Sequence, residues 1–305
     1  MKKYLFVINP VAGGRTGERI RQDLSREIKK NLSEPEYDLI FTGPGDIQYP
    51  QVDYETVVVA GGDGTIGKAV QALARRKTRP KLGIIPIGTG NDLARSLGIY
   101  AFMNSHGVAG LLAALRKGST RPLDVLSMNN EFFFTNYCGI GIDARIAAAF
   151  NKCRAKFRMP GKMLYVLLGL KNLPFSIPVP VTLSYQNRAF ENCSLSIPRG
   201  ARQIIITNIS SYAAGAKPSS GCRMDDGLFE VTVIRNTGQW LLLHMTRFFQ
   251  KPFDLLLPGI IRIQTAAIEV NGCGTLPCQL DGETIEGTRQ PLVIKVATRL
   301  EVIVP

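Results

Sequence analysis

A threefold succession of apolar run, glycine cluster and helical pattern constrains the first 125 residues more than any other feature. The three apolar runs are residues 4–8, 56–60 and 82–87, and an amphipathic helical pattern follows each glycine cluster. Runs that are apolar on both faces predict parallel strands covered by helices. Ligands bind at the carboxyl edge of such a sheet, so we expect the three glycine turns at one crevice. A fourth strand is predicted over residues 38–42.

The pattern changes after Asp124, where helical periods become rare and period-two runs typical of antiparallel strands dominate. These runs are residues 203–207, 229–233, 267–270, 292–296 and 300–304. We therefore predict an α/β protein with two domains. A doubly wound, mostly parallel, Rossmann-like sheet at residues 1–125 binds the nucleotide. A mostly antiparallel β domain follows at residues 126–305, with the return of its last strand to the first domain left open.

The charge and the cysteines limit the class of partner and the compartment. Lysine and arginine number 37 against 24 acidic residues, and this excess of +13 favours nucleic acid, phosphorylated small molecules or an anionic membrane surface. No run reaches the roughly 18 to 20 apolar residues of a membrane span, and the N-terminal run stops at Asn9-Pro10, too early for a signal peptide. Six scattered cysteines without a C-x-x-C pair predict reduced thiols in a cytoplasmic protein.

The middle glycine turn fits the start of two known phosphate-binding patterns and completes neither. Gly62-x-Gly64-x-x-Gly67 matches the dinucleotide fingerprint, but no acidic residue stands about 20 positions later to hold a ribose. The run from Gly62 to Lys68 begins a P-loop, but Ala69 replaces the required Ser or Thr. Three such turns at one sheet edge would still offer free backbone N–H groups and helix N-termini to phosphates. The alternative is that each glycine cluster only makes a tight turn.

Asp63 lies between two glycines of that middle turn. Phosphate would repel its carboxylate unless a cation intervenes, so we infer Mg²⁺ carried by a nucleotide, or a proton to be accepted. The alternative is that Asp63 caps the helix that follows it. Asn91 and Asp92 face the same alternatives, and capping is favoured for at least one of them.

Motifs from both halves resemble one known family. The N-terminal set resembles the catalytic domain of diacylglycerol kinases: Asn9-Pro10-x-x-Gly13-Gly14, Gly61-Gly62-Asp63-Gly64-Thr65 and Pro86-Ile87-Gly88-Thr89-Gly90-Asn91-Asp92-Leu93-Ala94-Arg95. The later set resembles the accessory domain of that family: Asn136-Tyr137-Cys138-Gly139-Ile140-Gly141-Ile142-Asp143-Ala144, Asn208-Ile209-x-x-Tyr212-Ala213-x-Gly215-Ala216-Lys217-Pro218, Asp225-Asp226-Gly227-Leu228 and Gln279-Leu280-Asp281-Gly282-Glu283. The short Gly-Gly-Asp-Gly-Thr element alone is similar to that of NAD kinases, sphingosine kinases and 6-phosphofructokinases. The longer runs point toward diacylglycerol rather than sphingoid substrates.

The resemblance implies a nucleotide site, a base and a cation site. ATP would lie between the two domains, and its phosphates would lie near Asn91 and Asp92. The other residues that would contact ATP are Asn9, Pro10, Val11, Ala12, Gly13, Thr42, Gly61, Gly62, Asp63, Gly64, Thr65, Ile66, Gly67 and Thr89. Asp281 would accept the proton of the lipid hydroxyl, with Glu283 beside it, although from the residues alone Asp-Gly between β-runs indicates a hairpin turn. Asp226 resembles a ligand of a structural Mg²⁺ that the backbone carbonyls of Arg223 and Leu228 also coordinate. The positive charge of the Arg223 guanidinium argues against a bound cation there.

Two basic and apolar segments are predicted to contact a membrane. The first combines Met163 to Leu168 with Arg145, Lys152, Arg154, Lys156, Arg158, Lys162 and Lys171, and contains no acidic residue after position 145. The second holds Trp240, Arg247, Phe248, Phe249, Lys251 and Phe253. The alternative for each is a buried helix with a solvated basic face. Nucleic acid is not expected, because the basic segments adjoin aliphatic runs rather than an array of stacking aromatic residues.

We therefore predict ATP-dependent phosphorylation of diacylglycerol to phosphatidic acid by a cytoplasmic protein that associates peripherally with the membrane. Another lipid alcohol as substrate (a sphingoid base, ceramide or a prenol), a non-catalytic nucleotide sensor, and a homodimer remain open alternatives.

Overall fold

The computed structural model describes residues 2–33, 36–42, 47, 49–50, 53–154, 161–213, 215–272, 275–285 and 290–305. The chain divides into two compact units. The first comprises Met1–Val125, Phe133–Thr135 and Ala297–Pro305, and the second comprises Leu126–Phe132 and Asn136–Val296. The strand β16 (Leu292–Ile303) has residues in both units.

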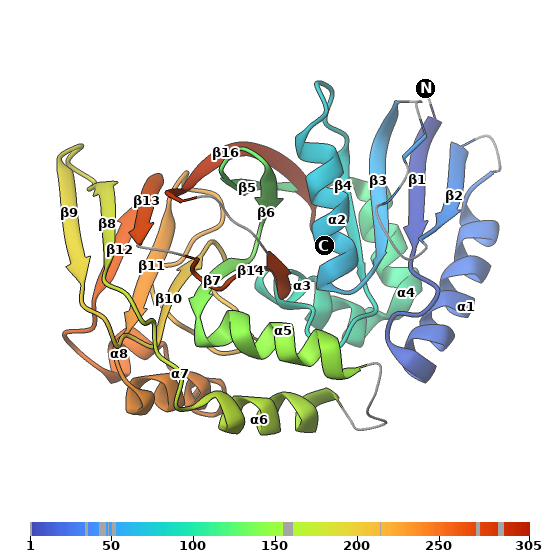
Figure 1. Cartoon of the computed structure of the whole chain (residues 1–305). Coiled ribbons are helices and arrows are strands. Elements are labelled where there is room, and N and C mark those ends of the chain that lie inside the picture. The colour runs from blue at the N-terminus through green and yellow to red at the C-terminus, as the bar shows by residue number, and fades with distance from the viewer. Residues whose placement is uncertain are drawn as a thin grey trace. The chain divides into compact units, whose positions relative to one another are not determined.

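The first unit is built on a parallel sheet in the order β2-β1-β3-β4-β16 (Figure 1). The strands are β1 (Lys2–Ile8), β2 (Tyr37–Phe41), β3 (Tyr54–Gly61) and β4 (Lys81–Pro86), followed by the end of β16. The end of β16 joins through Val302, which pairs with Leu82. Every neighbouring pair in this order is parallel. The described core positions of β1, β3 and β4 are almost fully buried, as expected for strands covered on both faces.

Helices follow the glycine turns and cover this sheet. They are α1 (Gly14–Asn31), α2 (Asp63–Ala74), α3 (Asp92–Ser96) and α4 (Ile99–Lys117). The strand order places β2 and β4 on opposite sides of the β1–β3 pair, so right-handed crossovers put α1 and α2 on opposite faces, as Figure 1 shows. The predicted doubly wound sheet is thereby confirmed, and its three glycine turns lie at one carboxyl edge.

The second unit contains a six-stranded antiparallel sheet in the order β12-β11-β10-β7-β14-β15. Its strands are β7 (Tyr137–Gly141), β10 (Gln203–Thr207), β11 (Phe229–Ile234), β12 (Arg262–Thr265), β14 (Cys278–Leu280) and β15 (Glu283–Ile285). A second antiparallel set pairs the start of β16 with β13 (Ala267–Gly272), then β8 (Val181–Gln186), then β9 (Asn192–Ile197). The predicted antiparallel second half is confirmed. The chain links the two units through β5 (Thr120–Met128), which pairs with β16 and with β6 (Phe132–Phe134).

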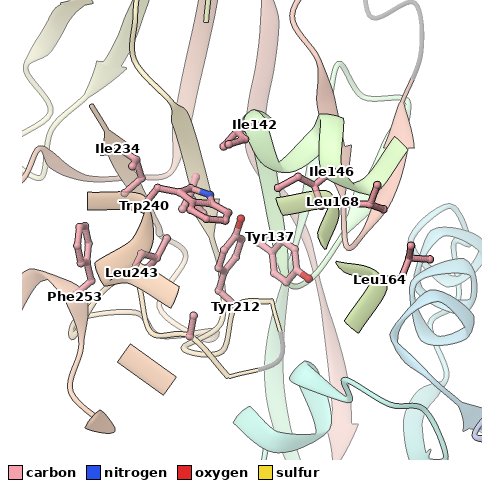
Figure 2. Close-up of a cluster of buried hydrophobic side chains, with 12 residues drawn as sticks. Tyr137, Ile142, Ile146, Leu164, Leu168, Tyr212, Ile234, Trp240, Leu243 and Phe253 are labelled. Atoms are coloured by element: carbon pink, nitrogen blue, oxygen red, sulfur yellow. The ribbon is translucent and has the colours of Figure 1, made fainter. Parts of the chain in front are cut away.

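The described residues of the second unit also form the helices α5 (Ile142–Arg154), α6 (Gly161–Asn172), α7 (Thr237–Phe249) and α8 (Phe253–Leu256). The Asn236 side chain caps α7 by accepting a hydrogen bond from the Gln239 N–H. A cluster of buried apolar side chains joins α5, α6 and α7 to the sheet (Figure 2). Trp240 and Phe253 belong to this cluster, so the prediction that these two aromatic side chains meet a membrane is wrong. Helical spacing points them inward, while their neighbours Phe248 and Phe249 are exposed.

Among the residues that the structure describes, no helix has the length and apolar character needed to cross a membrane. Five cysteines, Cys138, Cys153, Cys193, Cys222 and Cys278, are free thiols, and Cys273 lies outside the described residues. Lys156 and Arg158 of the predicted basic segment also lie outside them.

Candidate active site

Three loops meet at the carboxyl edge of the first unit's sheet, and glycine is what lets them approach. A Cβ on Gly88 would lie 2.4 Å from the Gly62 Cα, and one on Gly13 would lie 2.1 Å from the Ile87 carbonyl oxygen. Gly13 also has a φ of 73°, which favours glycine. The backbones of the loops after β1, β3 and β4 are therefore in direct contact. This arrangement gathers backbone N–H groups of the kind that bind phosphates.

Asn9 connects the first of these loops to α2. Its Nδ2 donates to the Thr65 Oγ1 at 2.8 Å, and its Oδ1 accepts from the Val11 N–H at 3.0 Å. Pro10 and Val11 then lie exposed in the loop between β1 and α1. An open hollow of about 450 Å³ adjoins this loop and is lined by Pro10, Glu18, Arg21, Gln22, Ser25 and Phe41.

The other predicted contacts differ in exposure. Thr89 is exposed at the tip of the third loop, and Thr42 follows β2 with its N–H bonded to the Ile8 carbonyl at 2.9 Å. Ile66 is only 1% exposed, so its side chain packs in the core and leaves its backbone as the group that could reach a ligand.

Asp63 does not cap its own helix. Gly62 occupies the N-cap position of α2 without a side-chain hydrogen bond. The Asp63 carboxylate instead accepts from backbone N–H groups at the start of α3, including that of Leu93 at 3.5 Å. Burial, and secondarily the negative charge of Asp92, raises the pKa of Asp63 to about 6, and the backbone hydrogen bonds oppose this shift. A desolvated carboxylate of raised pKa beside these glycine loops is a group that a cation would stabilise.

Asn91 and Asp92 both lie buried at the start of α3. Asn91 has a left-handed backbone, with a φ of 53°, and its Nδ2 donates to the Gly88 carbonyl at 2.7 Å. Its Oδ1 is buried and has no hydrogen-bond partner among the residues that the structure describes. Asn91 is the N-cap residue of α3 but makes no side-chain cap, because its side chain bonds to the Gly88 carbonyl instead. The third loop thus keeps one buried acceptor that a donor could satisfy.

Arg95 ends the third quoted motif but was not among the predicted site residues. Its Nε donates to the Gly90 carbonyl at 2.8 Å, and its guanidinium lies 3.9 Å from the Tyr100 ring centroid. The same residue ends the Gly-Thr-Gly-Asn-Asp-Leu-Ala-Arg run, so its position at the motif's end was the available signal.

A second candidate site lies at the turn between β14 and β15 in the second unit. Asp281 and Gly282 have φ values of 50° and 90°, as in a two-residue hairpin turn. The Asp281 Oδ1 accepts hydrogen bonds from the N–H groups of Asn136 and Tyr137, at 3.0 and 2.9 Å. The Asp281 N–H donates in turn to the Tyr137 carbonyl at 2.9 Å. The predicted hairpin is present, and its carboxylate is held by the start of β7.

A network of buried polar residues, which were not predicted from the sequence, is hydrogen-bonded to this turn. Gln279 accepts from the Gly282 N–H at 2.7 Å and donates to the Asp143 Oδ2 at 3.0 Å. The Tyr212 hydroxyl donates to the same oxygen at 2.5 Å, and the Gln203 Nε2 donates to the Tyr212 hydroxyl at 2.6 Å. All four side chains are at most 2% exposed. Asp143, Tyr212 and Gln279 all lie within the quoted motifs, but only the fold brings them together.

Glu283 lies across the turn from Leu280, on the exposed start of β15. Its carboxylate makes no hydrogen bond or ion pair with any residue that the structure describes, in contrast to the anchored Asp281. The turn therefore presents two carboxylates of different character, one fixed by backbone donors and one open to solvent.

The predicted cation loop, residues 223–228, offers few ligands. Asp226 accepts from the Leu228 N–H at 3.1 Å, and the Arg223 guanidinium pairs with Asp225 at 3.3 Å rather than with Asp226. Within the described ranges, no group of three His, Cys, Asp or Glu side chains could hold a metal ion. A cation here would depend on one carboxylate and backbone carbonyls.

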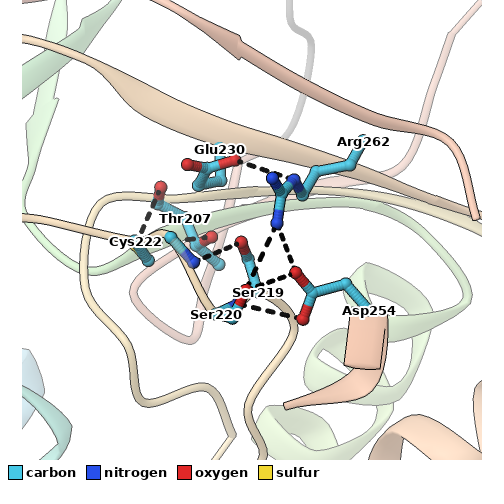
Figure 3. A network of polar contacts seen from close by, with 8 residues as sticks. Thr207, Ser219, Ser220, Cys222, Glu230, Asp254 and Arg262 are labelled. Carbon is cyan, nitrogen blue, oxygen red and sulfur yellow. Dashed lines mark hydrogen bonds and ion pairs between the residues drawn. The ribbon is translucent and has the colours of Figure 1, made fainter. Parts of the chain in front are cut away.

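A polar network borders the cation loop (Figure 3). Arg262 pairs with Asp254 and lies 3.8 Å from the buried Glu230, which ties β12, α8 and β11 together. Burial raises the pKa of Glu230, and burial also raises that of the nearby Cys222 thiol to about 12. Burial thus favours the protonated thiol form of Cys222.

Two family models match successive parts of the chain. A model of the diacylglycerol kinase catalytic domain matches residues 3–128, and a model of the diacylglycerol kinase accessory domain matches residues 133–284. The chain belongs to the diacylglycerol kinase family. The resemblance stated from the motifs is confirmed, and the chain is a phosphotransferase of lipid metabolism.

Several relatives span nearly the whole chain. A diacylglycerol kinase of Staphylococcus carnosus is 25% identical over 92% of this chain and 89% of its own length. One from Staphylococcus aureus is 25% identical over 92% of this chain and 86% of its own length. A crystal structure of a diacylglycerol kinase from Bacillus anthracis superposes with a TM-score of 0.70 at 21% identity, covering 100% of this chain and 97% of that one. The structural likeness supports the fold, and the family models support the enzyme class.

Proposed function

We propose that this kinase transfers the terminal phosphoryl group of ATP to the free hydroxyl of diacylglycerol and so produces phosphatidic acid. The observation that carries the proposal is the backbone contact between the loops after β1, β3 and β4, which builds a cradle for phosphates in the half that matches the catalytic domain. The alcohol class of the acceptor is supported by the family, in which the named relatives are diacylglycerol kinases.

ATP fits the cradle by its chemistry. The loops offer N–H groups and helix N-termini, and the hollow beside Pro10 leaves room next to the first loop. The buried Asn91 Oδ1 has no donor within the described part of the chain. When bound, Mg²⁺ neutralises charge that develops on the transferred phosphoryl group. Asp63 would hold this ion or its water shell, because a carboxylate whose pKa is raised by burial is a poor neighbour for phosphate alone.

The turn at Asp281-Gly282-Glu283 supplies the carboxylate that accepts the hydroxyl proton in this proposal. Asp281 is the first candidate, since the N–H groups of Asn136 and Tyr137 fix its orientation. Glu283 beside it is the second candidate, since it is exposed and unpaired among the described residues. The proposal requires the turn to come within reach of the ATP phosphates during catalysis.

The structural Mg²⁺ at Arg223, Asp226 and Leu228 stays a prediction. The Asp226 carboxylate and the backbone carbonyls support it, and the pairing of Arg223 with Asp225 keeps the guanidinium off Asp226. Peripheral association with an anionic membrane surface is proposed as well, because diacylglycerol stays in the bilayer and no described helix could span it.

Incubation with labelled ATP, Mg²⁺ and vesicles carrying one lipid alcohol each tests the proposal. We expect label in phosphatidic acid, and little label on a sphingoid base, ceramide or a prenol. Label on another alcohol alone would replace the substrate, and ATP binding without transfer to any of them would favour the nucleotide sensor.

Two isosteric variants separate the roles at the turn. Asp281→Asn and Glu283→Gln should each retain ATP binding. The variant that removes the base should lose at least about a thousandfold in kcat, because it loses both general-base catalysis and the orientation of the lipid hydroxyl. Full turnover by both variants would exclude the turn as the source of the base.

A further inference from the structure

The outer surface of α6 and α7 exposes more large apolar side chains than the rest of the described chain. Six of the eleven such residues lie there: Leu167, Leu170, Leu241, Met245, Phe248 and Phe249. We call these six the α6–α7 face. Phe248 is 72% exposed and Phe249 52%, which is unusual for aromatic side chains on neighbouring positions. An apolar cluster of this kind marks an interaction surface.

Helix α7 is apolar on two opposite sides. Trp240 and Leu243 enter the buried cluster of Figure 2. Leu241, Met245 and Phe248 follow at spacings of four and three residues, so they form one stripe that points away from that cluster. A helix that is apolar all round is normally covered on all sides. The outer stripe of α7 is therefore a surface that no residue of the described ranges covers.

Helix α6 contacts α7 and exposes apolar side chains of its own. A Cβ on Gly169 of α6 would lie 3.4 Å from the Trp240 ring, so the two helices are in contact through a glycine. Leu164 and Leu168 of α6 enter the buried cluster, while Leu167 and Leu170 are exposed. Figure 1 shows α6 and α7 together on one side of the second unit's sheet.

The two segments that carry the α6–α7 face contain only basic charged residues. Lys171 follows Leu170 directly, Lys251 follows Phe249 by two residues, and Arg235 precedes α7; all three are exposed. Residues 161–172 and 235–253 contain no Asp or Glu. A second copy of this chain would bring like charges together at a two-fold interface. An anionic bilayer complements both the apolar side chains and their basic rim.

We propose that the α6–α7 face inserts into the headgroup region of an anionic membrane and holds the enzyme on the surface where its lipid lies. This deepens the proposed function by naming the docking surface. Phe248 and Phe249 enter the acyl boundary, and Lys171 and Lys251 contact lipid phosphates. Basic residues near an anionic leaflet and buried aromatic side chains each strengthen binding, so the two contributions are separable by substitution.

Co-sedimentation with anionic vesicles tests docking apart from catalysis when ATP and diacylglycerol are left out. The vesicles contain phosphatidylcholine with about 30% phosphatidylglycerol. We expect the double variant Phe248→Ser with Phe249→Ser to bind at least tenfold more weakly. Lys171→Gln and Lys251→Gln should each lower binding about fivefold at low salt. The matched control is Phe190→Ser, which removes a side chain that is 84% exposed in the β8–β9 turn and should bind like wild type.

A direct measure of depth comes from Phe249→Trp in a Trp240→Phe background. Its fluorescence should shift to shorter wavelength on the vesicles and be quenched by brominated acyl chains. Thermal unfolding of each variant checks that the fold is intact.

Unchanged vesicle binding by the Phe248/Phe249 double variant, or an equal loss in Phe190→Ser, would overturn the proposal. A wild-type dimer by light scattering that the double variant abolishes, with vesicle binding unaltered, would also overturn it and assign the face to a second copy. Turnover of a short-chain diacylglycerol in solution reports on the proposed function separately. Docking with the expected variant pattern but no turnover of any diacylglycerol would leave the docking surface standing and remove the proposed function.

Discussion

The side-chain oxygen of Gln279 accepts a hydrogen bond from the Gly282 N–H at 2.7 Å, so a fully buried residue fixes the turn that carries Asp281. The nitrogen of the same amide donates to Asp143. One side chain thus joins the exposed turn to a buried carboxylate. A buried polar side chain with both ends satisfied positions its neighbours strongly, because breaking either bond leaves a buried group unpaired.

Replacing Gln279 should uncouple the turn from this support. Gln279→Met keeps the side-chain volume but leaves the Gly282 N–H without its acceptor and removes a donor to Asp143, so unfolding free energy should fall by about 1 to 3 kcal/mol. We also expect kcat on diacylglycerol to fall at least tenfold with the KM for ATP unchanged. Urea unfolding and steady-state kinetics measure the two effects.

Tyr212→Phe is the control for Gln279→Met, because it removes another bond to Asp143 without touching the turn. We expect Tyr212→Phe to lose about as much unfolding free energy as Gln279→Met but to keep most of its kcat. If Tyr212→Phe lowers kcat as much as Gln279→Met, Gln279 acts only through general stability.

Gly88→Ala should open the phosphate cradle. The added Cβ would lie 2.4 Å from the Gly62 Cα, a distance that forces the second and third loops apart. We expect ATP affinity to fall at least tenfold by calorimetry, because displaced N–H groups no longer converge on one phosphate. Gly238→Ala, on α7, meets its nearest neighbour at an ordinary 3.4 Å and should bind ATP as wild type does. Equal affinity for Gly88→Ala would show that the cradle does not bind ATP.

Asp63→Asn should stabilise the ligand-free protein while lowering its activity. The folded pKa of about 6 exceeds the unfolded value of 3.8, so the ionised carboxylate destabilises the fold fully above pH 6. Removing the charge should raise the unfolding free energy at pH 7.5 by up to about 3 kcal/mol. This gain should shrink as the pH falls through 6 and vanish near 4. A gain that is independent of pH would contradict the electrostatic cause.

His244 should make the protein sensitive to acid. Burial lowers the pKa of His244 from 6.5 to about 3, and the adjacent Arg247 contributes through its charge and donates to Nδ1 at 2.8 Å. The unfolded state therefore takes up a proton that the folded state refuses, and stability falls as the pH drops below 6.5. At pH 4.5 the loss should reach about 3 kcal/mol.

His244→Asn keeps an acceptor for Arg247 but does not titrate, so this acid-dependent part should be absent from its unfolding curve. The comparison uses the slope of the unfolding free energy against pH, because loss of the imidazole ring lowers stability at every pH. An identical slope in wild type and variant would assign the acid sensitivity elsewhere.

The parallel sheet and the antiparallel second half could be predicted because their signals are local. Apolar runs such as 56–60 already show burial on both faces, and the glycines mark the turns at their ends. The hairpin at Asp281-Gly282 was predictable for the same reason, since the required backbone angles favour this pair of residues.

The orientation of the helices and the partners of the buried polar groups could not be predicted. Trp240 and Phe248 are both large aromatic residues, yet Trp240 packs inward and Phe248 is exposed. The side of a helix that is buried depends on which other elements the helix packs against. Asp63 could cap its own helix by sequence, but the fold turns its carboxylate to α3, which is 30 residues further along the chain.

The amino-acid sequence by itself determined the two-part α/β architecture, the glycine loops and the family, since periodicity and motif are properties of neighbouring residues. Tertiary structure alone decided that Asp281 is held by Asn136 and Tyr137, and that Gln279 meets Asp143. Such contacts join residues more than a hundred positions apart. Hydrogen-bond geometry of this kind follows from how strands align in a sheet, and no local pattern encodes that alignment.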